Sequence, residues 1–115
     1  MTAIAALRRA GVRVAVGADN LQDPFNPIGR GDPLESAGLA ILTAHQLPED
    51  AFLSVSSVAR DIMGLADAAP KVGSIADLML TPSVTIREAI ASSPPRTLVI
   101  RHGHVTFSRL AQPKR

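Results

Sequence analysis

The first regular pattern along the chain is a short alternation of valine with other residues. Residues 12–16 read VRVAV and stop at Gly17, so this run predicts a buried strand that ends at a loop. Ahead of it, the spacing of apolar residues predicts a short helix that Thr2 caps, that runs to about Arg9, and that Gly11 ends. A helix followed by a strand and a polar loop is the repeating unit of a parallel α/β barrel.

In the middle of the chain, the apolar residues are spaced for helices. Residues 18–33 come first, and their three prolines and three acidic residues without periodicity predict a long loop. Residues 34–46 then have a broad apolar face that predicts one helix, and Pro48 marks its end. The apolar positions over 49–64 predict a second helix.

The last third of the chain favours strands. Residues 75–80 predict a short apolar strand interrupted by Asp77, and residues 84–91 predict a short helix. Residues 97–100 and 104–107 predict a hairpin that turns around the residues between them. A tight hairpin makes its strands antiparallel, so these strands do not fit easily into a parallel sheet.

Composition narrows the chemistry that the 115 residues support. There is no cysteine, so disulfides, thiolate metal ligands and a thiol nucleophile are excluded. The net charge is +2 and aromatic residues make up 3%, which leaves little basic or stacking surface for nucleic acid. Because no apolar run reaches the length of a membrane span and the start does not look like a signal peptide, we expect a cytoplasmic protein without nucleic-acid or membrane partners.

Several stretches resemble one enzyme family. Residues 17–20 (GADN) and 23–29 (DPFNPIG) resemble the loop after the eighth strand of cytosine deaminases and related ring-hydrolysing amidohydrolases. The family's pattern there is an acidic residue at the strand end, followed by Asp-Pro-aromatic-x-Pro-x-Gly. Residues 73–78 (GSIADL) look like a shortened form of the family's return strand, and residues 96–107 look like its closing hairpin. The resemblance covers most of the chain.

The resemblance implies an α/β fold, the C-terminal part of a (β/α)8 amidohydrolase barrel plus part of the flanking small β-sandwich. It assigns residues 1–72 to the last barrel strand, the active-site loop and the C-terminal barrel helices. Residues 73–108 are then the return strands and the closing hairpin, and residues 109–115 are a basic tail. Since a whole barrel needs about 250 residues, we expect this chain to be a fragment, as from a truncated gene or a split reading frame.

The activity that the resemblance implies is hydrolytic deamination of a pyrimidine or a related nitrogen heterocycle by a metal-dependent hydrolase. In the family a divalent metal, zinc or iron, is held by a His-x-His pair, further histidines and a Glu, all of which precede the strand that starts here. Asp19 is the implied metal ligand and catalytic proton shuttle. A catalytic metal needs about three protein ligands, so we expect the isolated chain to bind none and to be inactive.

Asn20 and Phe25 are the substrate-binding candidates that the resemblance implies. The Asn20 amide is positioned to hold Asp19 or a ring substituent, and Phe25 to lie near the substrate ring. The alternatives stay open, because Asn20 and Asp19 also suit a turn and Phe25 also suits core packing. Asp23 precedes Pro24 and is expected to fix the shape of the loop.

The histidines and serines are weaker candidates. His102 and His104 imitate a metal-binding pair, but they fall in the predicted hairpin and have no third ligand nearby in sequence, so we do not assign them a metal. His45 is predicted to end a helix. The serines at 54, 56 and 57 lie in a helical pattern without a Gly-x-Ser-x-Gly elbow, which disfavours serine hydrolase chemistry.

The alternative function is a non-catalytic interaction module, or a gene remnant, that self-associates. A face that meets a barrel in the family is expected to be apolar, and large apolar patches rarely stay bare. A third possibility is pairing with a missing N-terminal half supplied by a separate chain. In the enzyme interpretation, the partner is a small heterocyclic substrate.

Overall fold

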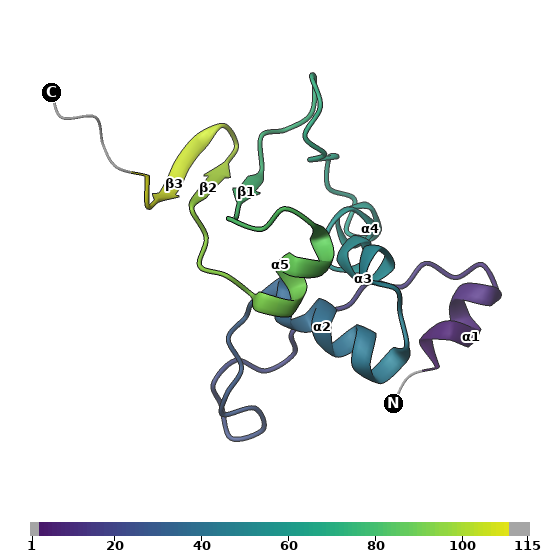
Figure 1. Ribbon diagram of the computed structural model, residues 1–115. Coiled ribbons are helices and arrows are strands. Elements are labelled where there is room, and N and C mark those ends of the chain that lie inside the picture. Colours follow the sequence, from purple (N-terminus) through teal and green to yellow (C-terminus); the bar gives the residue numbers. More distant parts are fainter. Residues whose placement is uncertain (1–2, 111–115) are drawn as a thin grey trace, which may run out of the picture.

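The computed structural model describes residues 3–110, which form five short helices and three strands (Figure 1). The predicted cap Thr2 and most of the predicted basic tail lie outside these residues. The elements are, in chain order, α1 Ile4–Arg9, α2 Pro33–Ala44, α3 Pro48–Ser54, α4 Ser57–Ile62, β1 Leu78–Leu80, α5 Ile86–Ser92, β2 Leu98–Arg101 and β3 His104–Ser108. No helix within 3–110 is long and apolar enough to cross a membrane.

Helix α2 has clear start and stop signals. The Asp32 side chain accepts the Leu34 backbone N–H at 2.9 Å, and Pro33 occupies the first turn, where a missing N–H costs nothing. His45 ends the helix in the left-handed region, with φ 52°, which confirms it as a helix-end residue. The predicted helix over 34–46 is therefore confirmed, with its boundaries moved by one or two residues.

The core lies where α2 crosses α3 and α5. Its buried apolar residues are Leu34, Ala37, Ala40, Ala51 and Ile90. Because three of the five are alanines, the helices approach closely and the core holds few large side chains. Val16, from the segment ahead of the 17–31 loop, also packs against this cluster.

The helix predicted over 49–64 is wrong as a single element, because the chain forms α3 and α4 instead. The Ser54 hydroxyl donates to the Ala51 carbonyl at 2.8 Å, and the Ser56 hydroxyl donates to the Phe52 carbonyl at 2.6 Å. Serine hydroxyls that bond backbone carbonyls in this way bend or interrupt helices. Ser56 itself departs from helical geometry, with φ −127° and ψ −102°.

The three strands form one antiparallel sheet in the order β1-β2-β3. The predicted hairpin is confirmed, with Arg101 opposite His104 and a register irregularity between Val99 and Ile100. The strand predicted over 75–80 shortens to β1, because the backbone N–H of Asp77 donates to the Ile75 carbonyl at 2.9 Å and that of Ile75 donates to the Asp67 carbonyl at 3.3 Å, away from β2. A sandwich needs two sheets, and residues 3–110 form one sheet of three strands.

The strand predicted over residues 12–16 is wrong for this chain. Residues 12–20 lie in neither a helix nor a strand. A strand needs a hydrogen-bonded neighbour, and within 3–110 the backbone N–H of Val16 bonds instead to the Ser54 carbonyl of α3, at 3.0 Å. The observed fold is thus a small mixed helix and sheet domain, and it has no barrel strand of its own among the described residues.

Candidate functional site

The candidate site is the loop of residues 17–31, which connects the valine-rich segment to α2 (Figure 1). Its first functional candidate, Asp19, is exposed and has a φ of 57°. Gln22, three residues later, has a φ of 47°. Left-handed backbone is unusual for residues other than glycine and is tolerated best by Asp and Asn. Asp19 therefore adopts a backbone conformation that suits its residue type, and its side chain lies on the surface.

Asp23 organises the loop. Its carboxylate accepts the side-chain amide of Asn20 and the backbone N–H groups of Phe25, at 3.0 Å, and Asn26, at 2.9 Å. The Asn20 amide, followed by these two backbone donors, holds the pKa of the Asp23 carboxyl below its ordinary value, because each donor favours the charged form. The expectation that Asp23 fixes the loop is consistent with this geometry. The side-chain amide of Asn20 donates to Asp23, so it does not hold Asp19 in this structure.

A second set of contacts closes the loop. The Asn26 side-chain amide donates to the Asn20 carbonyl at 3.1 Å, and the Gly29 N–H donates to the Asn26 carbonyl at 3.2 Å. Gly29 is buried, and a Cβ at this position would lie 2.6 Å from the Asn20 carbonyl oxygen. Only glycine allows the two ends of this turn to approach so closely. The DPFNPIG motif thus encodes a preformed turn.

The apolar side chains of the loop face solvent. Phe25 is 88% exposed and Ile28 is 79% exposed. Core packing of Phe25, one of its two interpretations, is therefore wrong for this structure. A bare phenylalanine on a rigid turn offers a flat apolar surface to another molecule or to another part of a larger protein.

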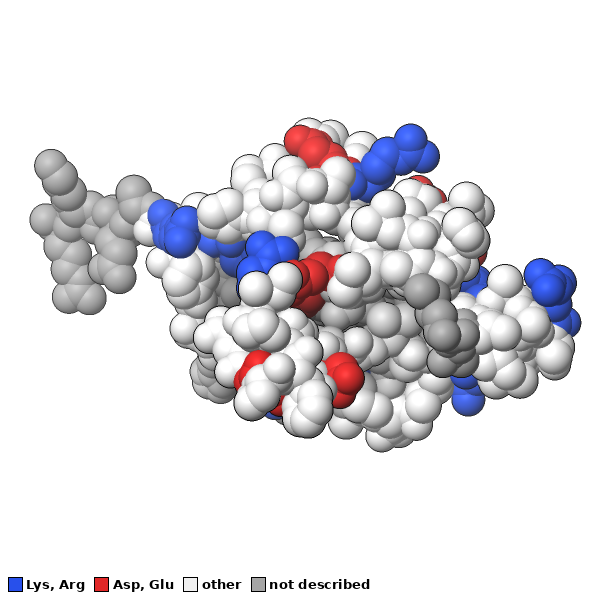
Figure 2. Space-filling model, turned by 90° about the horizontal axis from the view of Figure 1, so that it is seen from below, with Lys and Arg blue, Asp and Glu red and all other residues white. Residues whose placement is uncertain are grey.

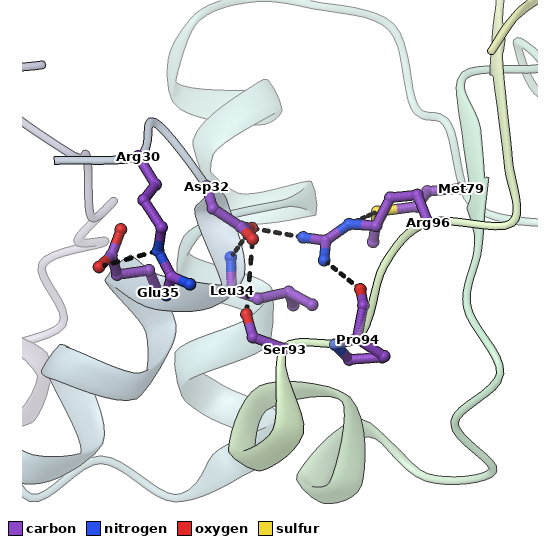
Figure 3. A network of polar contacts seen from close by, with 8 residues as sticks. All are labelled: Arg30, Asp32, Leu34, Glu35, Met79, Ser93, Pro94 and Arg96. Atoms are coloured by element: carbon purple, nitrogen blue, oxygen red, sulfur yellow. Dashed lines mark hydrogen bonds and ion pairs between the residues drawn. The ribbon is translucent and has the colours of Figure 1, made fainter.

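The end of the loop is tied to the sheet by a network that the sequence analysis missed (Figure 3). Asp32 caps α2 and also forms an ion pair with Arg96, which follows α5. The second oxygen of the Asp32 carboxylate lies 3.4 Å from the Ser93 hydroxyl. Arg96 also donates to the Pro94 carbonyl at 2.8 Å. The signal in the sequence was an Asp directly before the proline of a helix start, which is typical of a cap.

A second carboxylate, Asp77 in the GSIADL motif, ties the hairpin to the helices. It accepts the His102 backbone N–H at 2.7 Å and the Arg60 guanidinium at 3.0 Å. The His102 N–H, and after it Arg60, keep the pKa of Asp77 below its ordinary value, because both favour the carboxylate. In this chain the GSIADL motif therefore joins the β2–β3 hairpin to α4.

His102 and His104, the pair that imitates metal ligands, take different positions in the hairpin. His102 lies in the hairpin turn with a φ of 49°, and His104 begins β3, so the two do not share a regular strand face. No group of three or more His, Cys, Asp or Glu side chains within 3–110 could hold a metal. Asp19 alone supplies one carboxylate, so the described residues by themselves do not fit a complete divalent-metal centre.

The charged side chains are spread over the surface. Figure 2 shows Lys, Arg, Asp and Glu in small separate groups on the face that it draws, with uncharged atoms between them. The ion pairs include Arg8 with Asp50, at 2.8 Å, and Lys71 with Asp67, at 2.7 Å. On this face, charge does not mark out a second candidate site.

Comparison with solved structures places the whole chain on part of larger enzymes. Two crystal structures of 5-methylcytosine deaminase from Klebsiella pneumoniae, liganded with 5-fluorocytosine and with phosphonocytosine, match 100% of this chain with a TM-score of 0.81, at 28% and 27% identity. N-isopropylammelide isopropylaminohydrolase from Burkholderia multivorans matches 90% of the chain with a TM-score of 0.80, at 32% identity. The resemblance to cytosine-deaminase-like amidohydrolases is confirmed.

The chain spans only a small share of each relative. It covers 29% of the Klebsiella deaminase chains and 27% of the Burkholderia enzyme. A protein of Escherichia coli, YahJ, is 29% identical over 110 residues, which are 91% of this chain and 24% of that protein. No protein-family model matches the chain. These shares are consistent with one section, the C-terminal one, of a larger amidohydrolase.

Proposed function

We propose that this chain, whose fold is that of a section of a cytosine-deaminase-like amidohydrolase, supplies the loop that closes over the substrate in a hydrolytic deaminase. The observation that carries the proposal is the preformed turn of residues 19–29, in a chain that superposes along its whole length on a cytosine-type deaminase. The reaction would replace the exocyclic amino group of a nitrogen heterocycle by oxygen, using water and releasing ammonia.

Asp19 is the proposed catalytic residue. In this role its carboxylate takes a proton from the attacking water and delivers a proton to the departing amine, which requires a carboxylate that reaches the substrate. The exposed position of Asp19 supports this role, because within residues 3–110 its side chain stays outside the Asp23 contacts that shape the loop. As a metal ligand, Asp19 would contribute one ligand to a centre whose other ligands lie outside this chain.

Phe25 and Asn20 have different proposed roles. Phe25 is exposed and held by the Asp23 turn, so its ring is available to lie against a planar heterocycle once the rest of the enzyme covers the loop. Asn20 is proposed to reach the substrate only indirectly, because its amide is engaged with Asp23. In this proposal residues 1–72 carry the site, and residues 73–108, the return strands and closing hairpin with α5 between them, support it.

The experiment is a chimera in which this chain replaces the matching section of the Klebsiella deaminase. Ammonia release from 5-methylcytosine and cytosine is expected, and Asp19→Asn is expected to reduce kcat by about 10²–10⁴-fold. The matched control is Asp67→Asn, since that carboxylate pairs with Lys71 in the segment between α4 and β1, outside the loop. A folded chimera that deaminates equally well with Asn at position 19 would refute the proposal.

A further inference from the structure

The loop of residues 17–31 is connected to the rest of the domain at its two ends. In the described part of the chain, the hydrogen bonds of residues 18–29 have both partners inside the loop. Before the loop, the Val16 N–H donates to a carbonyl of α3. After the loop, Asp32 caps α2 and forms an ion pair with Arg96. The loop's own contacts set its shape, so these two ends have to set its placement.

The two limbs of the loop meet directly beside Asp32. A Cβ at Gly31 would lie 3.1 Å from a methyl carbon of Leu21, so the Leu21 side chain lies against the Gly31 backbone. Gly31 has a φ of 63°, which glycine adopts without strain. Leu21 follows Asp19 by two residues. A displacement of Asp32 is therefore passed to the limb that carries the Asp19 carboxylate.

Arg96 is held at its backbone and at its guanidinium. The next residue, Thr97, donates its N–H to a carbonyl of β1 at 2.8 Å. The guanidinium donates to the Pro94 carbonyl at 2.8 Å and to the sulfur of Met79 in β1 at 3.0 Å (Figure 3). A guanidinium is planar and its donors have fixed directions. These contacts therefore fix the plane from which the remaining nitrogen of the group reaches Asp32.

The ion pair between Asp32 and Arg96 is largely shielded from solvent. The side chain of Arg96 is 18% exposed and that of Asp32 is 20% exposed. Shielding reduces the screening that makes most surface ion pairs weak. The pair of Arg60 and Asp77 is shielded to nearly the same degree, at 23% and 19%, but it joins α4 to the GSIADL motif and lies outside the loop. It therefore provides a matched control.

We propose that Arg96 is a positioning residue. Through Asp32, it holds the loop against the sheet, so that Asp19 and Phe25 lie where the substrate reacts. Arg96 has no contact with the substrate in this role. The loop's placement is then set by a residue of the C-terminal section, while its shape is set by the loop itself. The inference rests on the proposed function for the purpose of the placement, and the placement can be measured without any reaction.

The placement is measured in the isolated chain by residual dipolar couplings, which report how the amides of 20–29 are oriented relative to α2. Arg96→Gln removes the guanidinium and leaves the Asp32 cap. We expect the amide chemical shifts of 20–29 to stay, because the loop keeps its own contacts, and the couplings to lose their common fit with α2. Arg60→Gln should leave the couplings unchanged.

A second variant tests the same pair from the other side. Asp32→Ser keeps a capping hydroxyl for α2, but its side chain is shorter and uncharged, so the ion pair with Arg96 is lost. The couplings of 20–29 are expected to change as they do in Arg96→Gln. The variant also gives the measurement if Arg96→Gln does not fold.

The kinetic test uses the chimera with the Klebsiella deaminase. Arg96→Gln is expected to lower kcat/KM by about 10–100-fold, because small misplacements of catalytic groups are costly. KM should rise as well, since Phe25 moves with the loop, whereas a smaller folded fraction lowers the apparent kcat and leaves KM unchanged. Arg96→Lys keeps the charge and should restore part of the activity. Arg60→Gln should match the unaltered chimera.

The outcomes separate the inference from the proposed function. Unchanged couplings in Arg96→Gln would overturn the positioning role, and so would an active chimera in which Arg96→Gln and Arg60→Gln have the same kcat and KM. If the couplings change but the chimera releases no ammonia, or Asp19→Asn leaves its activity intact, the positioning of the loop stands and only the proposed function fails.

Discussion

The helical unit of α2, α3 and α5 and the loop of residues 19–29 are held together in different ways. The helical unit depends on burial, with Leu34 1% exposed at its centre. The loop has almost no buried apolar surface and depends on the side chains of Asp23 and Asn26, which bond backbone groups within a few residues. The shape of the loop thus depends on contacts within the loop itself, whereas the helical unit depends on contacts between segments that are far apart in the sequence.

The largest effect is expected from removing the centre of the helical unit. Leu34→Ala deletes the most buried large side chain and should lower the free energy of unfolding by about 2–5 kcal/mol. Leu42→Ala is the matched control, since Leu42 lies on the same helix but is 75% exposed and should cost less than about 0.5 kcal/mol. Chemical denaturation followed by circular dichroism measures both. Equal losses would mean that the core is not where we place it.

The next effect comes from the junction between the two regions. Asp32→Ala removes both the cap of α2 and the ion pair with Arg96, and should cost about 1–2 kcal/mol. The control is Asp61→Ala, because Asp61 and its partner Arg13 are both largely exposed and such pairs contribute about 1 kcal/mol or less. The same denaturation measurement applies. A smaller loss for Asp32→Ala than for Asp61→Ala would contradict the network in Figure 3.

A smaller and more local effect is expected from Gly29→Ala. The new methyl group would meet the Asn20 carbonyl at 2.6 Å, so the turn must open. Since the loop adds little to the core, we expect large changes in the amide chemical shifts of 20–29 but a change of less than about 1 kcal/mol in global stability. Gly17→Ala is the control, because nothing lies within 4 Å of its Cβ position. Unchanged loop shifts in Gly29→Ala would show that the turn is not closed.

The smallest effect is a pH dependence of the loop. Because the folded loop lowers the pKa of Asp23 below 3.8, its stabilisation is present above that pH and is lost as the pH falls through the lowered pKa. Asn20→Ala removes the largest cause and should raise the pKa towards 3.8, whereas Asn26→Ala keeps the backbone donor to Asp23 and should change it less. Carboxyl NMR titration measures the shift. A lower pKa in Asn20→Ala would contradict the assignment.

The sequence was informative where a pattern acts locally. The hairpin and α2 follow from alternation, helical spacing and turn residues, all of which are local to each element. The strand over 12–16 was wrong because a strand also needs a neighbour, which no local pattern reports. The break between α3 and α4 depended on which carbonyls the hydroxyls of Ser54 and Ser56 reach, and spacing alone does not show that.

The candidate site was predictable to a similar degree. The motif over 17–29 located the loop, and Asp23 before a proline predicted a residue that shapes it. The partner of Asn20 was not predictable, because Asp19 and Asp23 both lie within its reach along the chain. The Asp32–Arg96 pair joins residues 64 positions apart, so no local pattern connects them.

The most direct test of the central claim is ammonia release by the unaltered, isolated chain, supplied with divalent zinc or iron and with cytosine or 5-methylcytosine. We predict no release above the background without protein, because the described residues contribute one candidate catalytic carboxylate and no complete metal-binding group. Sustained turnover that Asp19→Ala abolishes would contradict this account, since it would show that a complete centre forms from this chain alone.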